Sequence, residues 1–200
     1  MLRAFVRVLL HLSFLGGALL CMGVQAFATT IELSAAEFYY FCRQPDRPGI
    51  VTIYVRTSFN IGTTASRFRV QASPEVTWSY LSETSSFPTT LGNTQSGITI
   101  CYDQCVVDQA VLVAINYMVF GTSPNCGGQL FVSPHPDAHT VEVINCDGTA
   151  SSATTVGVVV GDFCSCPSPR SYAGTPQLFG CGPLSTKVST WGAVKALYQH

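Results

Sequence analysis

Residues 50–56 read Ile-Val-Thr-Ile-Tyr-Val-Arg, and this stretch decides the fold class. In an extended chain successive side chains point to opposite sides, so Val51, Ile53 and Val55 share one side. Thr, Tyr and Arg residues occupy the other side. This alternation predicts a β-strand that buries one face and leaves the other in water.

Strand signals of the same kind recur at intervals of about ten residues along the chain. No convincing helix separates them, so the sequence predicts an all-β fold. An antiparallel β-sandwich of about eight or nine strands is the expected architecture, and a barrel is the alternative. The further strands are expected at residues 37–41, 67–71, 76–80, 97–100, 110–120, 129–133, 140–145 and 155–160.

Residues 110–120 are apolar at almost every position. A run of this length fits a strand buried on both faces at the centre of a sheet. A helix is the alternative, but Val111, Val113, Ile115 and Val119 are β-branched and disfavour it.

The first 28 residues carry the pattern of a secretory signal peptide. Arg3 and Arg7 precede an apolar run over residues 8–20, and Ala26-Phe27-Ala28 offers a cleavage site. Polar and glycine residues interrupt the run, which is shorter than the roughly 20 residues that span a bilayer. Acylation of Cys21, as in a bacterial lipoprotein, is a weaker alternative. We therefore expect cleavage after residue 28, no membrane span afterwards, and a location outside the cytoplasm: extracellular, periplasmic or at the cell surface.

Cysteine usage supports this compartment. The chain has nine cysteines, and removal of Cys21 with the signal peptide leaves an even number in an oxidising environment. We expect disulfides, because the single residue between two of the cysteines departs from the paired spacing of zinc knuckles. The candidates are Cys42, Cys101, Cys105, Cys126, Cys146, Cys164, Cys166 and Cys181.

The pairing of these cysteines stays open, since eight of them allow about a hundred arrangements. Cys101 and Cys105 either close one tight loop or reach different neighbouring strands. Cys126 and Cys146 are expected near the ends of strands that could be adjacent.

The sequence changes character after residue 163. Residues 164–188 are rich in Cys, Pro and Gly and predict a linker pinned by its cysteines. Residues 189–200 predict a short amphipathic helix behind a Ser or Thr cap. Its apolar side should dock on the sandwich or on a sorting or surface partner, and the docking residues are Trp191, Val194, Leu197 and Tyr198.

Charge excludes some classes of partner. The chain has 10 basic and 11 acidic residues and a formal net charge of -1. Nucleic acid and anionic membranes require clustered Lys and Arg, so we expect neither as a partner. The classes of partner that the charge does not exclude are a protein or a polysaccharide at the cell surface.

The sequence contains no recognised catalytic motif. No G-x-S-x-G, H-E-x-x-H or phosphate-binding glycine loop occurs. His135, Asp137 and His139 could ligate a metal, but the flanking prolines favour a solvated turn. Other carboxylates are scattered through expected loops. We therefore predict no catalytic, cofactor-binding or metal-binding residues.

Aromatic residues raise the alternative of sugar binding. Trp78 shares its expected face with Val76 and Tyr80, which places it in the core. Tyr54, beside Arg56 on the polar face of its strand, is a better candidate for an exposed ring.

Four stretches together resemble the layout of cohesin-like sandwich modules: residues 49–55, 64–70, 112–120 and 157–160. This resemblance implies an Ig-like or cohesin-like sandwich that recognises a protein partner through a sheet face. No duplicated calcium loop of the dockerin type is visible, so the partner would come from another chain. The sequence is also similar to a group of bacterial secreted proteins without an assigned activity, through residues 82–87 and the tail TWGAVKALY at 190–198.

These observations predict a secreted, disulfide-stabilised, non-catalytic structural or interaction module. A carbohydrate-binding module and an extracellular hydrolase are the alternatives.

Overall fold

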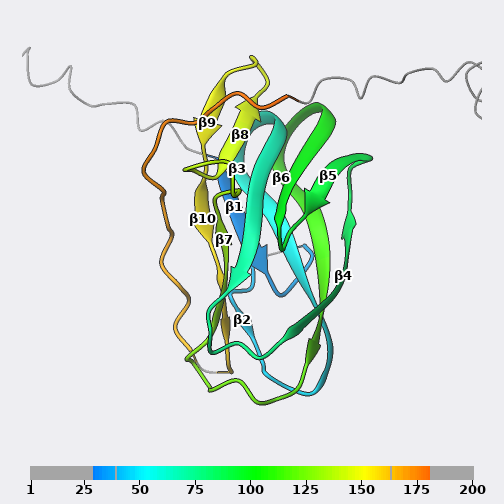
Figure 1. Cartoon of the computed structure of the whole chain (residues 1–200), viewed down its shortest axis with the longest axis vertical. Coiled ribbons are helices and arrows are strands. Elements are labelled where there is room, and N and C mark those ends of the chain that lie inside the picture. The colour runs from blue at the N-terminus through cyan, green and yellow to red at the C-terminus, as the bar shows by residue number, and fades with distance from the viewer. Residues whose placement is uncertain (1–28, 39, 163, 181–200) are drawn as a thin grey trace, which may run out of the picture.

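The computed structural model describes residues 29–38, 40–162 and 164–180, and every regular element within them is a β-strand (Figure 1). The all-β prediction is confirmed for this part of the chain, in which no helix is long and apolar enough to cross a bilayer. The expected signal peptide and C-terminal helix lie outside the described residues. The strands are β1 (Thr30–Ser34), β2 (Arg43–Gln44), β3 (Gly49–Ala72), β4 (Ser79–Ser85), β5 (Thr89–Asn93), β6 (Gly97–Val119), β7 (Gln129–Ser133), β8 (Glu142–Asn145), β9 (Ala150–Ser152), β10 (Thr154–Val156) and β11 (Val158–Val160).

The strands pack as a sandwich of two layers (Figure 1). In the first layer β10 pairs with β1, β1 with the first half of β3, that half with the second half of β6, and β6 with β4. In the second layer the other half of β3 pairs with β7, β8 and the first half of β6, and β5 pairs with β6. β9 extends the layer from β8, and β11 and β2 extend it from β7.

One ladder between β3 and β6 runs through both layers. Its register shifts four times between Val55 and Ala65. Such irregularities bend a strand pair and increase its twist. Gly62 lies at this bend with φ +123°, a conformation that favours glycine. Residues 97–100 and 110–120, predicted as two strands, are therefore parts of one long strand that crosses between the layers.

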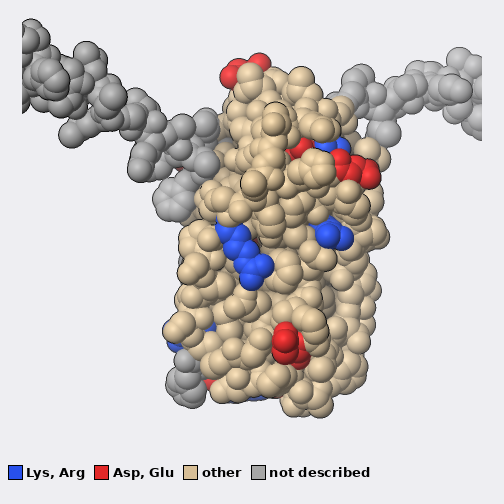
Figure 2. Space-filling model, turned by 60° about the vertical axis from the view of Figure 1, so that its left-hand side comes forward, with Lys and Arg blue, Asp and Glu red and all other residues tan. Residues whose placement is uncertain are grey.

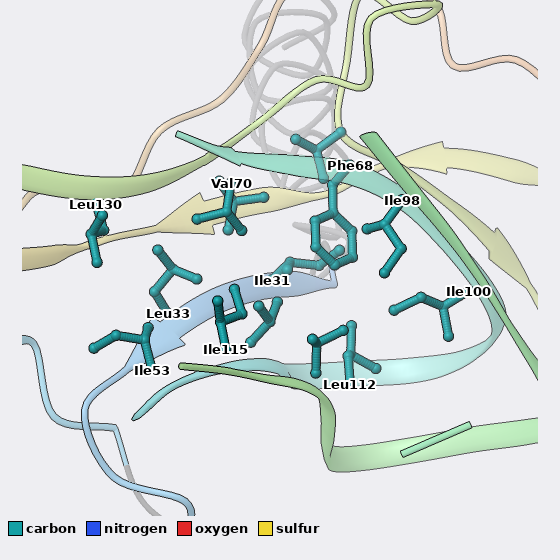
Figure 3. Close-up of a cluster of buried hydrophobic side chains, with 14 of the residues drawn as sticks. Ile31, Leu33, Ile53, Phe68, Val70, Ile98, Ile100, Leu112, Ile115 and Leu130 are labelled. Atoms are coloured by element: carbon teal, nitrogen blue, oxygen red, sulfur yellow. The ribbon is translucent and has the colours of Figure 1, made fainter. Parts of the chain in front are cut away.

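The core lies between the layers (Figure 3). Ile31, Leu33 and Ile53 of the first layer pack with Phe68 and Leu130 of the second, and all five side chains are fully buried. Each such burial contributes about 1.5–3 kcal/mol to folding. The alternation seen in residues 50–56 is thus the pattern that places one side of β3 in the core.

The expectation of a purely antiparallel sandwich was wrong in two places. β10 runs parallel to β1, and β2 runs parallel to β11. The described residues also hold eleven strands instead of eight or nine. β2 and β9 were not predicted because two or three residues are too few for an alternating pattern to be recognised. The five-residue β5 was not predicted either, and residues 155–160 are divided between β10 and β11.

Two strand positions also differ from the prediction. The first strand is β1, not residues 37–41, because Ile31 and Leu33 enter the core whereas Phe38 and Phe41 are 81% and 47% exposed. The strand expected at residues 76–80 begins only at Ser79.

Residues 110–119 form an interior strand of the first layer, between β3 and β4, but they are not buried on both faces as predicted. Val113, Ile115 and Tyr117 point into the core, whereas Ala114 and Asn116 are only partly buried on the opposite side. One face of this apolar strand therefore remains accessible.

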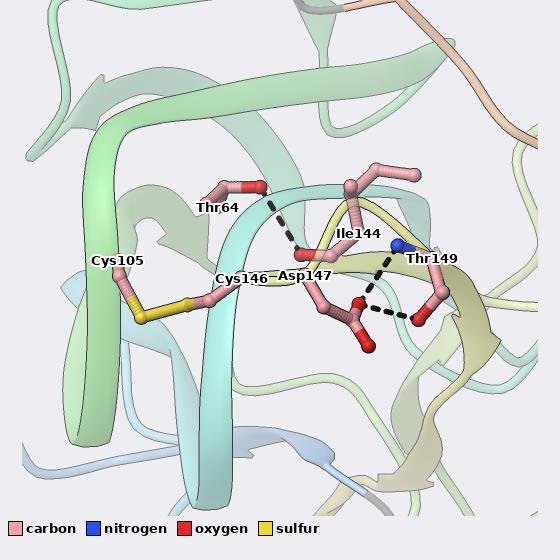
Figure 4. Close-up of a disulfide and its surroundings, with 6 residues drawn as sticks. All are labelled: Thr64, Cys105, Ile144, Cys146, Asp147 and Thr149. Carbon is pink, nitrogen blue, oxygen red and sulfur yellow. Dashed lines mark hydrogen bonds between the residues drawn. A yellow bond between two sulfur atoms is a disulfide. The ribbon is translucent and has the colours of Figure 1, made fainter.

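Three disulfides join segments that are distant in sequence: Cys42–Cys166, Cys105–Cys146 and Cys126–Cys164. Cys101 is disulfide-bonded as well. Cys101 and Cys105 do not close a tight loop with each other, since Cys105 reaches the segment after β8 (Figure 4). Cys126 and Cys146 are not partners either.

Residues 164–180 run along the sandwich in extended form. Arg170 forms a backbone bridge with Thr155, and its guanidinium group lies over the ring of Phe131. The Tyr172 hydroxyl donates to the carbonyl of Val132 at 2.8 Å. This part of the segment predicted as a linker is therefore fixed to the domain by hydrogen bonds as well as by disulfides.

Candidate interaction surface

The outer side of the first layer carries a continuous surface built by β3, β6 and β4. Because the strands are in register, outward side chains of the three strands stand side by side. We call this surface the three-row face. Its rows are Ile50, Met118 and Ser79; Thr52, Asn116 and Ser82; and Tyr54, Ala114 and Thr84.

The core fixes the direction of these side chains. Ile53, Val113 and Ile115 alternate with them along β3 and β6 and are fully buried. Turning the three-row face inward would bring these core residues into water, so the register is strongly determined.

Hydrogen bonds join the middle row across all three strands. The Thr52 hydroxyl donates to Asn116 Oδ1 at 2.8 Å, and Asn116 Nδ2 donates to Ser82 Oγ at 3.1 Å. Asn116 is thereby held in one orientation at the centre of the face. A surface with prearranged polar groups loses little side-chain entropy when it binds a partner.

Apolar side chains flank this polar row. Ile50 is 66% exposed, and Met118 beside it is partly exposed. None of the nine side chains of the three-row face is charged. Figure 2 shows that charged groups are also sparse on another side of the molecule. Uncharged surface of mixed polarity can be buried without desolvating ions.

β4 is at the edge of this layer, and among the described residues it pairs with β6 alone. Tyr80 of this strand pairs with the core-facing Tyr117, and the two rings lie 6.3 Å apart, so Tyr80 does not belong to the three-row face. Leu81, at the bulge that follows, is 45% exposed, so the edge carries a further exposed apolar side chain.

Beyond the third row, the same outer side carries two buried charged residues. Glu32 on β1 and Arg56 on β3 are register partners and are only 6% and 2% exposed. Each lines its own cavity. The Glu32 pocket has a volume of about 350 Å³, and the Arg56 pocket, which also involves Glu37, Phe38 and Gln109, has about 300 Å³.

Burial shifts the pKa values of two groups that line the Glu32 pocket, the carboxyl group of Glu32 and the hydroxyl group of Tyr40. It raises the pKa of Glu32, and a hydrogen bond from Ser58 Oγ at 3.0 Å and the nearby positive charge of Arg56 only partly oppose this effect. Burial and the charge of Glu32 together raise the pKa of Tyr40 to about 12. The Tyr40 hydroxyl donates to the carbonyl of Gly157 at 3.2 Å.

Arg56 was expected on the wet face of its strand, and this expectation was wrong because neighbouring residues cover it. Its Nη2 donates to Gln109 Oε1 at 2.6 Å and to the carbonyl of Phe38 at 3.3 Å. Nε and Nη1 are buried without a hydrogen-bond partner in the described part of the chain.

The histidine turn does not form a metal site in the structure. Asp137 donates its backbone N–H to His135 Nδ1 at 3.2 Å, while the Asp137 carboxylate lies 3.7 Å from the same nitrogen. Burial lowers the pKa of His135, so the neutral ring accepts this hydrogen bond. Among residues 29–38, 40–162 and 164–180, no group of three His, Cys, Asp or Glu side chains could hold a metal ion.

Trp78 is unsuited to stack on a sugar. Its ring packs against the core at 5.9 Å from the ring of Tyr117, and its Nε1 donates to Asp46 Oδ1 at 2.6 Å. Tyr54 lies on the outer side, as expected, and belongs to the three-row face.

The sequence analysis did not identify Glu32 as a site residue, because little in the local sequence indicates that its side chain is buried. Glu32 occupies an outward position between Ile31 and Leu33, where a charged residue is ordinary. Its burial depends on Tyr40 and residues 166–169, whose approach follows from the Cys42–Cys166 disulfide. The expected docking residues Trp191, Val194, Leu197 and Tyr198 lie outside the described part of the chain.

Comparison with known proteins finds similarity in structure. No protein-family model and no curated protein matches the sequence. A type I cohesin from Clostridium thermocellum, solved in complex with a dockerin, superposes with a TM-score of 0.49 and 9% identity over 67% of this chain and 98% of the cohesin. A non-cellulosomal cohesin from the archaeon Archaeoglobus fulgidus superposes with a TM-score of 0.48 and 12% identity, over 66% of this chain and 89% of the cohesin. The sixth cohesin of scaffoldin B from Acetivibrio cellulolyticus superposes with a TM-score of 0.48 and 10% identity, over 67% of this chain and 98% of the cohesin.

The chain is thus similar to cohesin modules in its strand layout, at low identity. The similarity to bacterial secreted proteins that share the tail at residues 190–198 stays a prediction.

Proposed function

We propose that this protein is a secreted, non-catalytic interaction module, which acts outside the cell or at the cell surface and binds a protein partner through the three-row face. One observation carries the proposal. The hydrogen-bonded row of Thr52, Asn116 and Ser82 lies beside the exposed Ile50 on a face whose nine side chains are all uncharged.

A protein partner suits this chemistry. Interface centres are depleted in charge and combine apolar contacts with a few placed hydrogen bonds. Ile50 and Met118 supply apolar contact, and Asn116 supplies a polar group whose orientation is already fixed. The edge strand β4 adds Ser79, Ser82 and Thr84 to the same face.

The disulfides support a location outside the cytoplasm, because such bonds persist in oxidising compartments. We extend the proposal to the termini. Residues 1–28 are removed as a signal peptide, and residues 189–200 form a helix that docks through Trp191, Val194, Leu197 and Tyr198. Intact mass of the secreted protein tests the cleavage after residue 28 and shows whether residues 189–200 are retained, which their docking requires.

Polysaccharide is the second candidate ligand. Phe38 and Phe41 are exposed on the segment after β1, and Tyr54 is accessible on the outer side of the same layer. Exposed rings are the groups on which sugars stack. A pull-down with insoluble polysaccharides that retained the protein would favour this candidate.

The proposed function is tested by placing a charge on the face. Met118→Lys and Asn116→Lys put an ammonium group at the centre of the contact, so both should abolish capture of a purified or co-secreted protein partner. Leu91→Lys is the matched control, because Leu91 is 50% exposed on β5 in the second layer. Equal capture by all three variants, or loss only with Leu91→Lys, would exclude the three-row face.

A further inference from the structure

The Glu32 pocket continues the outer side of the first layer next to the three-row face. Its floor follows the sheet register, in which Thr30 lies between Ser58 and Thr154, and Glu32 lies beside Val156. Tyr40, Cys166, Pro167 and Pro169 form its walls.

The pocket has depth. Glu32 and Ser58 on the floor are 6% and 3% exposed, whereas Tyr40 at the wall is 37% exposed. Pro169 is also exposed to solvent. A long side chain can therefore enter between Tyr40 and the prolines and reach the carboxylate of Glu32.

The charge of the lining selects the kind of side chain. Glu32 is the one ionisable carboxylate among the lining residues, and the remaining polar groups are the hydroxyls of Thr30, Ser58, Thr154 and Tyr40. The pocket contains no cationic lining residue; Arg56 lines the neighbouring cavity. Ser58 supplies one hydrogen bond to a carboxylate that can accept several.

We propose that the Glu32 pocket takes a basic side chain, lysine or arginine, presented by the protein partner that covers the three-row face. The ammonium or guanidinium group would bind the carboxylate of Glu32, and the stem of the side chain would pack against Val156, Pro167 and the ring of Tyr40. Charge-assisted hydrogen bonds of this kind are about twice as strong as neutral ones. The proposal rests on the proposed function for the origin of the side chain, but the pocket can be tested without the partner.

The probe is n-butylammonium, which reproduces the end of a lysine side chain, and n-butanol is its uncharged match. Both are titrated into the full chain produced in an oxidising compartment and followed by NMR of the backbone amides. We expect saturable shifts at Thr30, Ser58 and Thr154 with n-butylammonium and none with n-butanol. Lowering the pH should weaken binding, because protonation of Glu32 removes the charge that the probe contacts.

Two variants make the test specific. Glu32→Gln removes the charge and keeps the shape, and it should weaken binding about tenfold or more, as loss of a charge-assisted hydrogen bond implies. Glu37→Gln is the matched control, since it removes an exposed carboxylate beside the Arg56 pocket and should leave binding unchanged. Absence of saturable shifts, equal binding of n-butanol, or unchanged affinity of Glu32→Gln would overturn the proposal. None of these results would affect the lysine variants of the three-row face, so the two proposals fail separately.

Discussion

Cys105 of β6 and Cys146, after β8, are joined by a disulfide (Figure 4). Both sulfur atoms lie against Gly62, at the bend where β3 and β6 cross between the layers. The backbone N–H of Cys146 donates to the carbonyl of Gly62 at 3.1 Å. The disulfide, the glycine and the bulges in the ladder therefore form one structural unit.

Gly62→Ala should destabilise the fold by about 1–3 kcal/mol, the usual range for backbone strain combined with overpacking. A Cβ atom at this position would lie 3.0 Å from Cys146 Sγ and 3.3 Å from Cys105 Sγ, in a residue with φ +123°. Denaturant unfolding measures the effect. Gly148→Ala is the control, because Gly148 has φ +83° but no atom within 4 Å of such a Cβ. Equal losses for the two variants would show that contact with the disulfide is unimportant.

Removal of the Cys42–Cys166 disulfide, by Cys42→Ser with Cys166→Ser, should reduce the free energy of unfolding by about 2–4 kcal/mol. The two cysteines are separated by 124 residues in sequence, and Cys166 lines the Glu32 pocket. The double variant should therefore also lose affinity for n-butylammonium. A variant of lower stability with unchanged affinity would show that the pocket does not depend on this bond.

Glu142→Gln should cost about 3–5 kcal/mol, the typical cost of breaking a buried ion pair. Glu142 is fully buried, Arg67 Nη2 lies 2.5 Å from its Oε2, and the backbone N–H of Gln177 donates to Oε1 at 2.9 Å. The double variant Arg67→Met with Glu142→Leu should recover much of the loss, because no unpaired charge remains. A double variant less stable than Glu142→Gln would contradict this explanation in a thermal denaturation series.

Glu32 predicts a specific dependence of stability on pH. Its pKa in the folded state is raised above the ordinary value of 4.5, so folding favours the protonated form. The contribution of this group to stability is fully present below pH 4.5 and is lost as the pH rises through the raised pKa. Glu32→Gln, which cannot ionise, should gain stability relative to the natural chain as the pH rises, and denaturant unfolding at a series of pH values measures the difference. If Glu32→Gln instead lost stability with rising pH, the charged form would be the favoured one.

Much of the fold could be predicted from local alternation. Residues 50–56 identified a half-buried strand, and their outward residues Thr52 and Tyr54 became part of the three-row face. The long ladder could not be predicted in the same way. Its bend passes through Asp103 and Asp108, which have positive φ values and read as loop residues although β6 continues through them.

The candidate sites depend on contacts between segments distant in sequence. The register that places Asn116 between Thr52 and Ser82 follows from three strands packing on one core, and no short motif encodes it. The burial of Glu32 and Arg56 requires neighbouring segments to fold over the outer side of the layer. One of these attachments is Cys42–Cys166, a pairing that cysteine spacing does not specify.

Photo-crosslinking most directly tests the central claim, that the three-row face binds a protein. A photoreactive amino acid replaces Ile50, the exposed residue beside the hydrogen-bonded row, or Leu91, on the second layer, and the secreted proteins are irradiated in their native surroundings. The account predicts a protein adduct from position 50 and none from position 91. An adduct only from position 91, or none from position 50 while the unmodified protein still captures its partner, would contradict it.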